Sequence, residues 1–232
     1  MNFREGVVLH IDKPYAMSSF GALAHIRYLL TNRMGYKVKV GHAGTLDPLA
    51  TGVLTLCTGK ATKTIETLQA HTKEYVATLQ LGASTASHDM EHPVDENFPT
   101  GHITKGRVEK VLLYFIGTVD QVPPVYSAVN VNGKRAYHLS RKGKDFEIKA
   151  KPVCIDEIEL LHFDAEMMQM SIRVVCGKGT YIRSLARDIG KALESGAFLT
   201  SLCRTRVGDV RVEDCITLEQ FSSWIESQNI EG

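Results

Sequence analysis

The chain has 232 residues, of which 44% are hydrophobic and 23% are charged, and its formal net charge is +1. These values are typical of a globular protein with an ordinary core, and no run of about 18 apolar residues predicts a membrane span. Because the amino terminus does not look like a signal peptide, we expect a cytoplasmic protein without a membrane anchor. Five scattered cysteines without a C-x-x-C pair indicate neither a disulfide framework nor a zinc ribbon.

The predicted elements follow one another without a regular alternation of strand and helix. Strands are expected at residues 6–12, 53–57, 75–81, 125–131, 155–163 and 167–176, and helices at residues 19–34, 60–70, 105–115, 180–193 and 217–227. Residues 40–51 and 82–100 are expected to be loops. This mixture favours an α+β fold over a doubly wound parallel sheet. No repeat or flexible linker divides the chain, so a single domain over residues 1–232 is expected.

Charge is segregated along the chain. Residues 133–151 carry seven Lys or Arg against two acidic residues, whereas the residues from 212 onward carry five acidic residues and no Lys or Arg. A local basic excess suits contact with a polyanion such as RNA, although a solvated basic face would have the same composition. Charge alone leaves both interpretations open.

Two short patterns look like binding motifs but lack features that the corresponding sites require. Residues 88–92, HDMEH, fit an H-x-x-E-H zinc pattern, but that site needs a helix, and Pro93 and the surrounding loop composition argue against one. Residues 58–62, TGKAT, lack the glycine spacing of a phosphate-binding loop and the Ser or Thr that should follow its lysine. We therefore expect neither a metal site nor an ATP site.

The segment that most resembles a catalytic site is residues 41–52, GHAGTLDPLATG. It contains one carboxylate, Asp47, and one imidazole, His42, in a loop whose glycines and proline exclude regular structure. Asp followed by Pro is also ordinary turn chemistry. Composition alone therefore leaves a purely structural role for Asp47 open.

Residues 41–54, GHAGTLDPLATGVL, resemble over their whole length the signature of TruB-type pseudouridine synthases. Four more segments resemble motifs of this family in the family's order, and the resemblance extends from about residue 6 to residue 208. They are DKPYAMSS at residues 12–19, KEYVATLQLG at 73–82, PPVYSAVNVNGKRAYHLSRKG at 123–143 and GKGTYIRSLARDIG at 177–190. The chain departs from the family at Cys203, where Arg is usual, and is expected to lack the extra carboxy-terminal RNA-binding domain of longer members.

The resemblance implies an α+β fold with a mixed, largely antiparallel central sheet flanked by helices, and a thumb-like RNA-binding insertion at about residues 121–151. The implied enzyme is a tRNA pseudouridine-55 synthase. Such an isomerase flips one uridine out of the T loop, cleaves its glycosidic bond and reattaches the base through C5. By this resemblance, the reaction needs no cofactor and no metal, and the expected partner is the T arm of tRNA. We expect a monomer without an obligate protein partner.

Three residues carry the implied chemistry. Asp47 would be the essential carboxylate, acting as a nucleophile or as a stabiliser of a sugar intermediate. Arg183 would pair with Asp47 and keep it charged, although an arginine on a helix can also be a surface cation. Tyr75 would stack on the flipped base and take part in proton removal at C5, although a strand tyrosine is most often a core residue.

Other residues would bind the RNA, as the resemblance implies. His42 would support the T loop after the uridine has left it, and Tyr181 and Leu202 would line the base pocket. Phosphate contacts are expected from four cations: Lys13, Lys134, Arg135 and Arg141.

Two further functions stay open. The first is an RNA chaperone that binds and remodels tRNA without needing catalysis. The second is a guide-dependent synthase that works on other RNAs inside a ribonucleoprotein. Undiminished product from Asp47→Asn would argue against the catalytic role, and activity only with partner proteins and guide RNA would favour the second alternative.

Overall fold

The computed structural model describes residues 1–127, 129–131, 133–140 and 146–230. The chain divides into two compact units, of which unit 1 contains Met1–Tyr75 and Leu202–Gly232, and unit 2 contains Val76–Ser201. Strands β4 (Lys73–Leu81) and β12 (Ala197–Val207) carry residues of both units. The expected single catalytic domain stays a prediction.

Within the described residues, ten strands form a mixed sheet in which β14, β1, β3, β12, β4, β11, β10 and β7 are hydrogen-bonded in that order. In addition, β2 pairs with β3, and β13 pairs with β12. The other strands of this sheet are β1 (Val8–Lys13), β2 (Val40–His42), β3 (Thr51–Thr58), β7 (Gly117–Gln121), β10 (Lys151–Asp164), β11 (Gln169–Cys176), β13 (Val210–Arg211) and β14 (Ile216–Thr217). Two small hairpins are separate: β5 (Ala83–Thr85) with β6 (Val94–Asn97), and β8 (Asn130–Val131) with β9 (Lys134–Arg135).

Most of the strand pairs are antiparallel, including β1 with β3, and β10 with both β11 and β7. Parallel pairing joins β1 to β14 and β12 to β3. The helices are α1 (Ser19–Met34), α2 (Ile65–Ala70), α3 (Lys105–Leu113), α4 (Ala136–Ser140), α5 (Ile182–Ala192) and α6 (Leu218–Ser227), with 3-10 turns η1 (Gly59–Thr64) and η2 (Val212–Asp214). The predicted α+β fold with a largely antiparallel sheet is confirmed.

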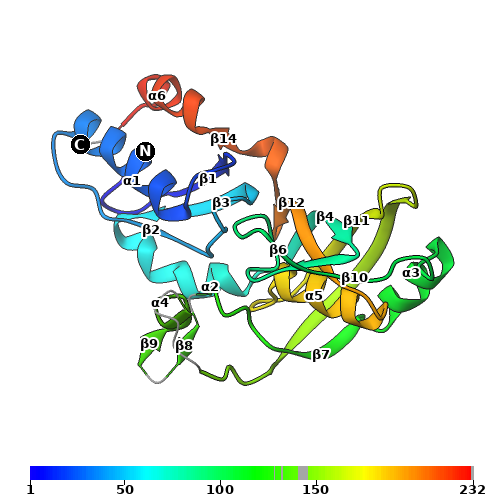
Figure 1. The fold of residues 1–232 in the computed structure, drawn as a ribbon. Coiled ribbons are helices and arrows are strands. Elements are labelled where there is room, and N and C mark those ends of the chain that lie inside the picture. Colours follow the sequence, from blue (N-terminus) through cyan, green and yellow to red (C-terminus); the bar gives the residue numbers. More distant parts are fainter. Residues whose placement is uncertain (128, 132, 141–145, 231–232) are drawn as a thin grey trace. The chain divides into compact units, whose positions relative to one another are not determined.

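Unit 1 is built around α1 and the β1–β3 pair. Helix α1 begins at Ser18, whose side chain accepts a hydrogen bond from the Gly21 N–H, and ends at Gly35, which has the positive φ of 70° that favours glycine. The helix buries a face spaced at three to four residues, including Ala22, Ile26 and Leu30. In Figure 1, α1 and α6 come from opposite ends of the chain and pack together in this unit.

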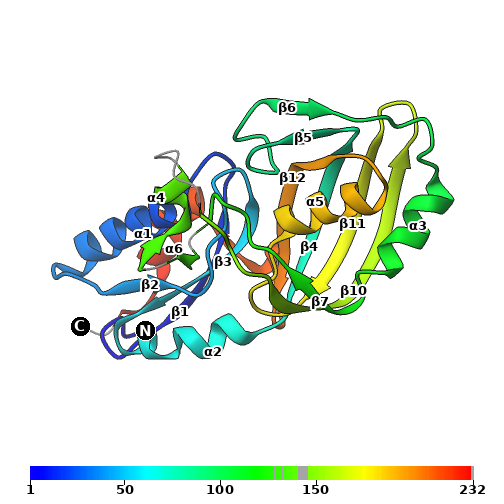
Figure 2. The same cartoon turned by 60° about the horizontal axis from the view of Figure 1, so that its bottom comes forward.

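Unit 2 contains α3, α5 and the strands that follow β4 in the sheet order, β11, β10 and β7. Strand β4 alternates buried and partly exposed residues along its whole length, as a strand with one core face should. Figure 2 shows α3 beside β10. Helix α5 is buried along most of its length, and Gly190 lets it approach β12, because a Cβ there would lie 2.4 Å from the Ala197 nitrogen. This close approach sets the position of α5, which carries Arg183.

The expected elements differ from the structure in several places. The sequence interpretation missed strands β7 and β12, the β5–β6 hairpin in the expected loop at residues 82–100, and β2 at the start of the expected loop at residues 40–51. Among the described residues of its predicted strand at 125–131, Asn130–Val131 forms a strand and the others are irregular. The helix predicted from residue 60 starts as the 3-10 turn η1. Strand β12 was missed because it has no clean alternation: it starts with three buried residues and later buries a charged one. In the described part of the chain, each helix is too short or too polar to span a bilayer.

Candidate active site

Asp47 lies in the loop that joins β2 to β3, and the antiparallel pairing of these two strands holds the ends of the loop together. Three small or apolar residues, Ala43, Leu46 and Ala50, are buried and anchor the loop, whereas Asp47 stays partly exposed. The backbone N–H of Ala50 donates to the Asp47 carbonyl at 3.1 Å, which closes a turn around the carboxylate residue. The loop thus presents Asp47 on an anchored backbone.

Ser19 fixes the middle of this loop from the first turn of α1. Its buried hydroxyl accepts a hydrogen bond from the Leu46 N–H and donates one to the Leu46 carbonyl, both at 2.8 Å. Both polar groups of the residue before Asp47 are therefore held by one side chain. The sequence interpretation assigned Ser19 no role in the Asp47 loop, although the residue is part of the quoted DKPYAMSS motif.

Lys13, the last residue of β1, is fully buried. Its ammonium donates hydrogen bonds to the carbonyls of Pro14 at 2.8 Å, Met17 at 2.6 Å and Pro48 at 3.3 Å. Since an ammonium has three hydrogens, these bonds use its whole donor capacity. The geometry therefore favours a structural role for Lys13 beside the Asp47 loop over the expected phosphate contact.

Arg204 holds the other side of the Asp47 loop from β12 and is only 2% exposed. Its Nε donates to the Val53 carbonyl at 2.8 Å, and its terminal nitrogens donate to the carbonyls of Thr45 and Gly44 at 3.5 and 3.3 Å. A Cβ at Gly52 would lie 2.2 Å from the Arg204 carbonyl oxygen, so glycine is required opposite Arg204 in the parallel β3–β12 pair. The sequence interpretation gave Arg204 no function.

The two buried cations also shape the local electrostatics. The pKa of Lys13 is lowered from 10.5 to about 8: burial is the largest cause, the nearby Asp47 opposes the shift, and Arg204 contributes to it. Burial likewise lowers the pKa of His42, and Arg204 adds to that effect. Because the pKa of His42 lies below its ordinary value of 6.5, the imidazole is mostly neutral at pH 7.

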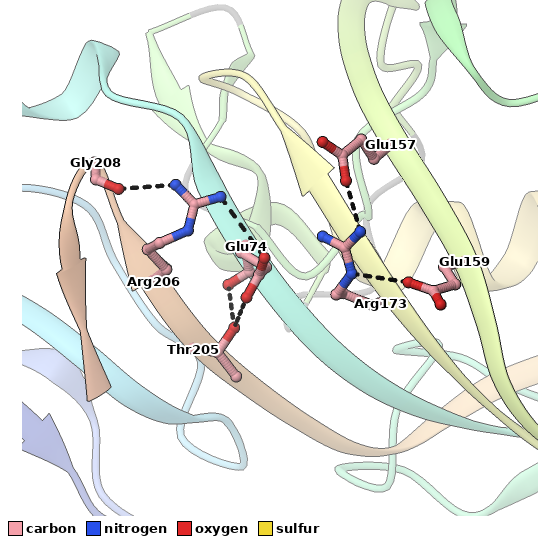
Figure 3. Close-up of polar contacts among 7 residues, drawn as sticks. All are labelled: Glu74, Glu157, Glu159, Arg173, Thr205, Arg206 and Gly208. Carbon is pink, nitrogen blue, oxygen red and sulfur yellow. Dashed lines mark hydrogen bonds and ion pairs between the residues drawn. The ribbon is translucent and has the colours of Figure 1, made fainter. Parts of the chain in front are cut away.

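Tyr75 and Leu202 lie in β4 and β12 within unit 1, where Tyr75 is buried and Leu202 is partly exposed. A polar cluster beside Tyr75 ties the two strands together (Figure 3). The Thr205 hydroxyl donates to the Glu74 carboxylate at 2.9 Å, and Arg206 pairs with the same carboxylate at 3.6 Å. These contacts join β4 to β12 at residues 74, 205 and 206, and the expected base-stacking role of Tyr75 stays a prediction.

Arg183 lies on α5 in unit 2 and is only 4% exposed, so the alternative of a surface cation is wrong. Its guanidinium donates to the Tyr126 carbonyl at 3.0 Å and to the Ser87 carbonyl at 3.4 Å, and it lies 3.7 Å from Oδ2 of Asp89. Asp47 and Arg183 belong to different units, so their expected pairing stays a prediction.

Asp89 belongs to the segment that looks like a zinc motif, but residues 86–92 form turns and bends rather than a helix. The Ser87 hydroxyl and the Glu91 N–H both donate to Oδ1 of Asp89, at 2.5 and 2.9 Å. His88 has a positive φ of 61°, and its pKa is lowered to about 4, first by burial and then by the nearby Arg187. The sequence interpretation missed the function of Asp89 as the partner of Arg183, because 94 residues separate them along the chain.

The remaining expected RNA contacts are placed only in part. Tyr181 directly precedes α5, is partly exposed, and its backbone N–H donates to the Gln121 side chain at 2.8 Å. Lys134 and Arg135 form β9, but their side chains lie outside the described part of the structure, and Arg141 falls in the undescribed segment 141–145. Their phosphate contacts stay predictions.

Comparison with known proteins assigns the family. Residues 31–182 match the family model described as "TruB family pseudouridylate synthase (N terminal domain)". The chain belongs to the TruB family. Residues 183–231 match a second model, described as "tRNA pseudouridylate synthase B C-terminal domain". The resemblance inferred from the sequence motifs is confirmed, and so is the expectation of a pseudouridine synthase.

Curated proteins are similar to this TruB-family chain along nearly their whole length. The tRNA pseudouridine synthase B of Bacteroides thetaiotaomicron is 61% identical, with 100% of this chain and 98% of the relative covered. The protein of the same name from Flavobacterium johnsoniae is 46% identical, with 97% of this chain and 98% of the relative covered.

Solved structures agree with this assignment. A chain in the structure described as "Crystal Structure of a Cbf5-Nop10-Gar1 Complex" is 30% identical, with a TM-score of 0.71 over 97% of the TruB-family chain. The present chain covers 56% of that protein, little more than half its length. The shared part therefore supports the fold, whereas the remainder of that protein has no counterpart in the alignment.

Proposed function

We propose that this TruB-family protein converts the uridine at position 55 in the T loop of tRNA to pseudouridine, with Asp47 as its catalytic carboxylate. The observation that carries the proposal is the arrangement around Asp47: a partly exposed carboxylate on a loop whose backbone is held by Ser19, Lys13 and Arg204. Such rigid support is what a reacting group needs in order to meet a substrate in one geometry. The names of the curated relatives support tRNA as the substrate.

The reaction rearranges bonds within one nucleotide. The N1–C1′ bond breaks, the base turns, a C5–C1′ bond forms, and the proton lost from C5 is balanced by one gained at N1. No atom is added or removed, so the chemistry asks the protein for orientation, charge and proton transfer. An ionised Asp47 can attack C1′ or stabilise positive charge on the sugar, and the proposal covers both.

The target base has to leave the T loop before it can reach Asp47, at a cost of a few kcal/mol. Tyr75 is the proposed stacking partner for the flipped base, since an aromatic platform contributes about 1 to 3 kcal/mol per base. Its hydroxyl is proposed to take part in the removal of the C5 proton. We propose that Tyr181 and Leu202 line the pocket, that neutral His42 supports the remaining T loop, and that Arg183 pairs with Asp47.

The RNA is proposed to be held through its phosphates. Lys134, Arg135 and Arg141 are the candidate phosphate contacts in the thumb-like insertion, and such contacts weaken as salt concentration rises. Because they touch the backbone, they position the tRNA without reading its sequence. We propose that the chain acts as a monomer on the T arm and needs no guide RNA.

The decisive test compares the wild type with Asp47→Asn on an unmodified tRNA transcript, followed by base-resolved pseudouridine mapping. We expect pseudouridine at position 55 with the wild type and none with Asp47→Asn, while tRNA affinity changes by no more than a few fold. The exposed residue Asp209 supplies the control, and Asp209→Asn should leave the product unchanged. A transcript with cytidine at position 55 should give no product.

The same experiment separates the alternatives. Undiminished product from Asp47→Asn would reject the catalytic assignment. Tight tRNA binding by the wild type without any product would favour the RNA chaperone, or, if product then appears on addition of guide RNA and partner proteins, the guide-dependent synthase.

A further inference from the structure

Arg204 is a charged residue in the interior of unit 1, on a strand whose neighbouring buried residues are apolar. Its side chain is 2% exposed, and its guanidinium donates hydrogen bonds to three backbone carbonyls, those of Gly44, Thr45 and Val53. A buried guanidinium is costly unless its N–H groups are satisfied. A leucine or methionine of similar size would fill the same volume without this cost, so stability alone gives a weak reason for an arginine here.

The three carbonyls are not scattered over the unit. Gly44 and Thr45 lie two and three residues before Asp47 in the loop, whereas Val53 lies in β3 just after the loop ends. One planar guanidinium therefore links the part of the loop that precedes Asp47 to strand β3, which follows the loop. Because its five donors have a fixed fork geometry, the guanidinium sets the relative position of these carbonyls more strictly than an ammonium could.

We infer that Arg204 is a positioning residue for Asp47: its guanidinium holds the backbone of the Asp47 loop in the reactive geometry and supplies a permanent positive charge beside it. The inference rests on the proposed catalytic role of Asp47. Lys13 supports the loop on its other side through the Pro48 carbonyl. The two cations repel each other electrostatically, and Arg204 also lowers the pKa of His42. Arg204 acts through the loop and need not touch the RNA.

Arg206 provides an internal comparison, because it lies two residues further along β12. It also bonds a backbone carbonyl, that of Gly208 at 2.8 Å, and pairs with Glu74 (Figure 3). These two partners lie outside the Asp47 loop, and the Arg206 side chain is 24% exposed. Replacing Arg206 therefore removes a charge from the same strand and leaves the loop contacts in place.

The test uses the full chain and three variants: Arg204→Lys, Arg204→Met and the control Arg206→Met. Single-turnover rate constants at saturating enzyme report the chemical step, and filter binding reports the tRNA dissociation constant. We expect Arg204→Lys to lower the single-turnover rate about 10- to 100-fold, since small misplacements of a reacting group have effects of this size. Arg204→Met should lose more activity, and both should bind tRNA within about threefold of the wild type.

Circular dichroism and thermal unfolding establish first that each variant is folded. A wild-type rate in Arg204→Lys, or an equal loss of rate in Arg206→Met, would overturn the inference. So would a loss explained fully by weaker tRNA binding. If neither Arg204 variant folds, the residue serves the fold and the positioning role is rejected.

Asp47→Asn is measured in parallel to keep the two proposals distinct. If Asp47→Asn is active, the proposed function itself fails. If Asp47→Asn is inactive while Arg204→Lys reacts like the wild type, only the role of Arg204 fails.

Discussion

The Asp47 loop of unit 1 and the Arg183 site of unit 2 both combine a charged side chain with backbone carbonyls and a group of opposite charge, but the charged side chain is an anion in unit 1 and a cation in unit 2. In unit 1, a partly exposed carboxylate sits on a loop whose backbone carbonyls are bonded by two buried cations, Lys13 and Arg204. In unit 2, a buried cation, Arg183, is bonded by backbone carbonyls and flanked by a buried carboxylate, Asp89. The first arrangement leaves a charged group accessible, whereas the second compensates its charge internally.

This difference indicates how each site responds to substitution. At the Asp47 loop, the supporting groups bond to the backbone, so their loss should displace the loop and slow the reaction. At the Arg183 site, the supporting carboxylate compensates a buried charge, so its loss should also destabilise the fold. Three predictions follow this contrast from the largest expected effect to the smallest.

The largest effect is expected from Asp89→Asn. Removing this carboxylate takes away a buried counter-charge that lies 3.7 Å from the Arg183 guanidinium, which should lower the free energy of unfolding by about 3 to 5 kcal/mol. We also expect a fall of about 100-fold in the single-turnover rate, because the guanidinium loses one of the groups that orient it. Urea unfolding and rapid-quench kinetics measure the two quantities.

Arg173→Gln is the matched control for Asp89→Asn within unit 2. Arg173 pairs with Glu157 at 2.6 Å and Glu159 at 3.1 Å, and both glutamates are 57% exposed (Figure 3). Its loss should reduce the free energy of unfolding by about 1 kcal/mol or less and leave the rate unchanged. Equal destabilisation by the two variants would contradict the assigned contrast between a buried and an exposed pair.

An intermediate effect is expected from Ser19→Ala. The substitution leaves the Leu46 N–H and carbonyl without their buried partner, which should cost about 1 to 3 kcal/mol of unfolding free energy. The rate should fall about 10-fold, because the loop next to Asp47 loses a fixed point. The neighbour Ser18 is the control: Ser18→Ala removes the N-cap of α1, at about 1 kcal/mol, without changing the rate. If both variants react alike, Ser19 has no special influence on the loop.

The smallest effect concerns pH. The folded-state pKa of Lys13 is lowered from 10.5 to about 8, mainly by burial. Below pH 8, Lys13 is charged in both states, whereas between pH 8 and pH 10.5 the unfolded chain binds more protons than the folded one. The contribution of Lys13 to the free energy of unfolding should therefore increase as pH rises through this window, by less than about 1 kcal/mol from pH 7.5 to pH 8.5.

Urea unfolding of the wild type and Lys13→Met at these two pH values measures the difference. The increase should be present in the wild type and absent from Lys13→Met. Parallel pH dependence in the two proteins would show that Lys13 keeps its ordinary pKa in the folded state.

The sequence predicted the regular elements best where one periodic pattern dominated. Helix α1 was predicted at residues 19–34 because apolar residues such as Leu23, Ile26 and Leu30 recur there at helical spacing, and the structure places the helix at the same residues. Strand β12 was not predicted, because its burial does not alternate: the strand begins with three buried residues, and the next buried residue is the charged Arg204. The β5–β6 hairpin was missed for a related reason, since β6 is exposed throughout and has no apolar face.

The amino-acid sequence by itself determined the family, the α+β class and the candidate carboxylate. The motif at residues 41–54 is long enough to identify the family and contains Asp47, and the irregular order of predicted strands and helices indicated the α+β class. Only the tertiary structure decided which groups support that carboxylate and the candidate arginine. Lys13 and Arg204 lie on different strands, and Asp89 reaches Arg183 from a distant loop. These contacts depend on how strands pair and where a helix packs, and no local pattern encodes them: a buried cation and an exposed one have the same letter in the sequence.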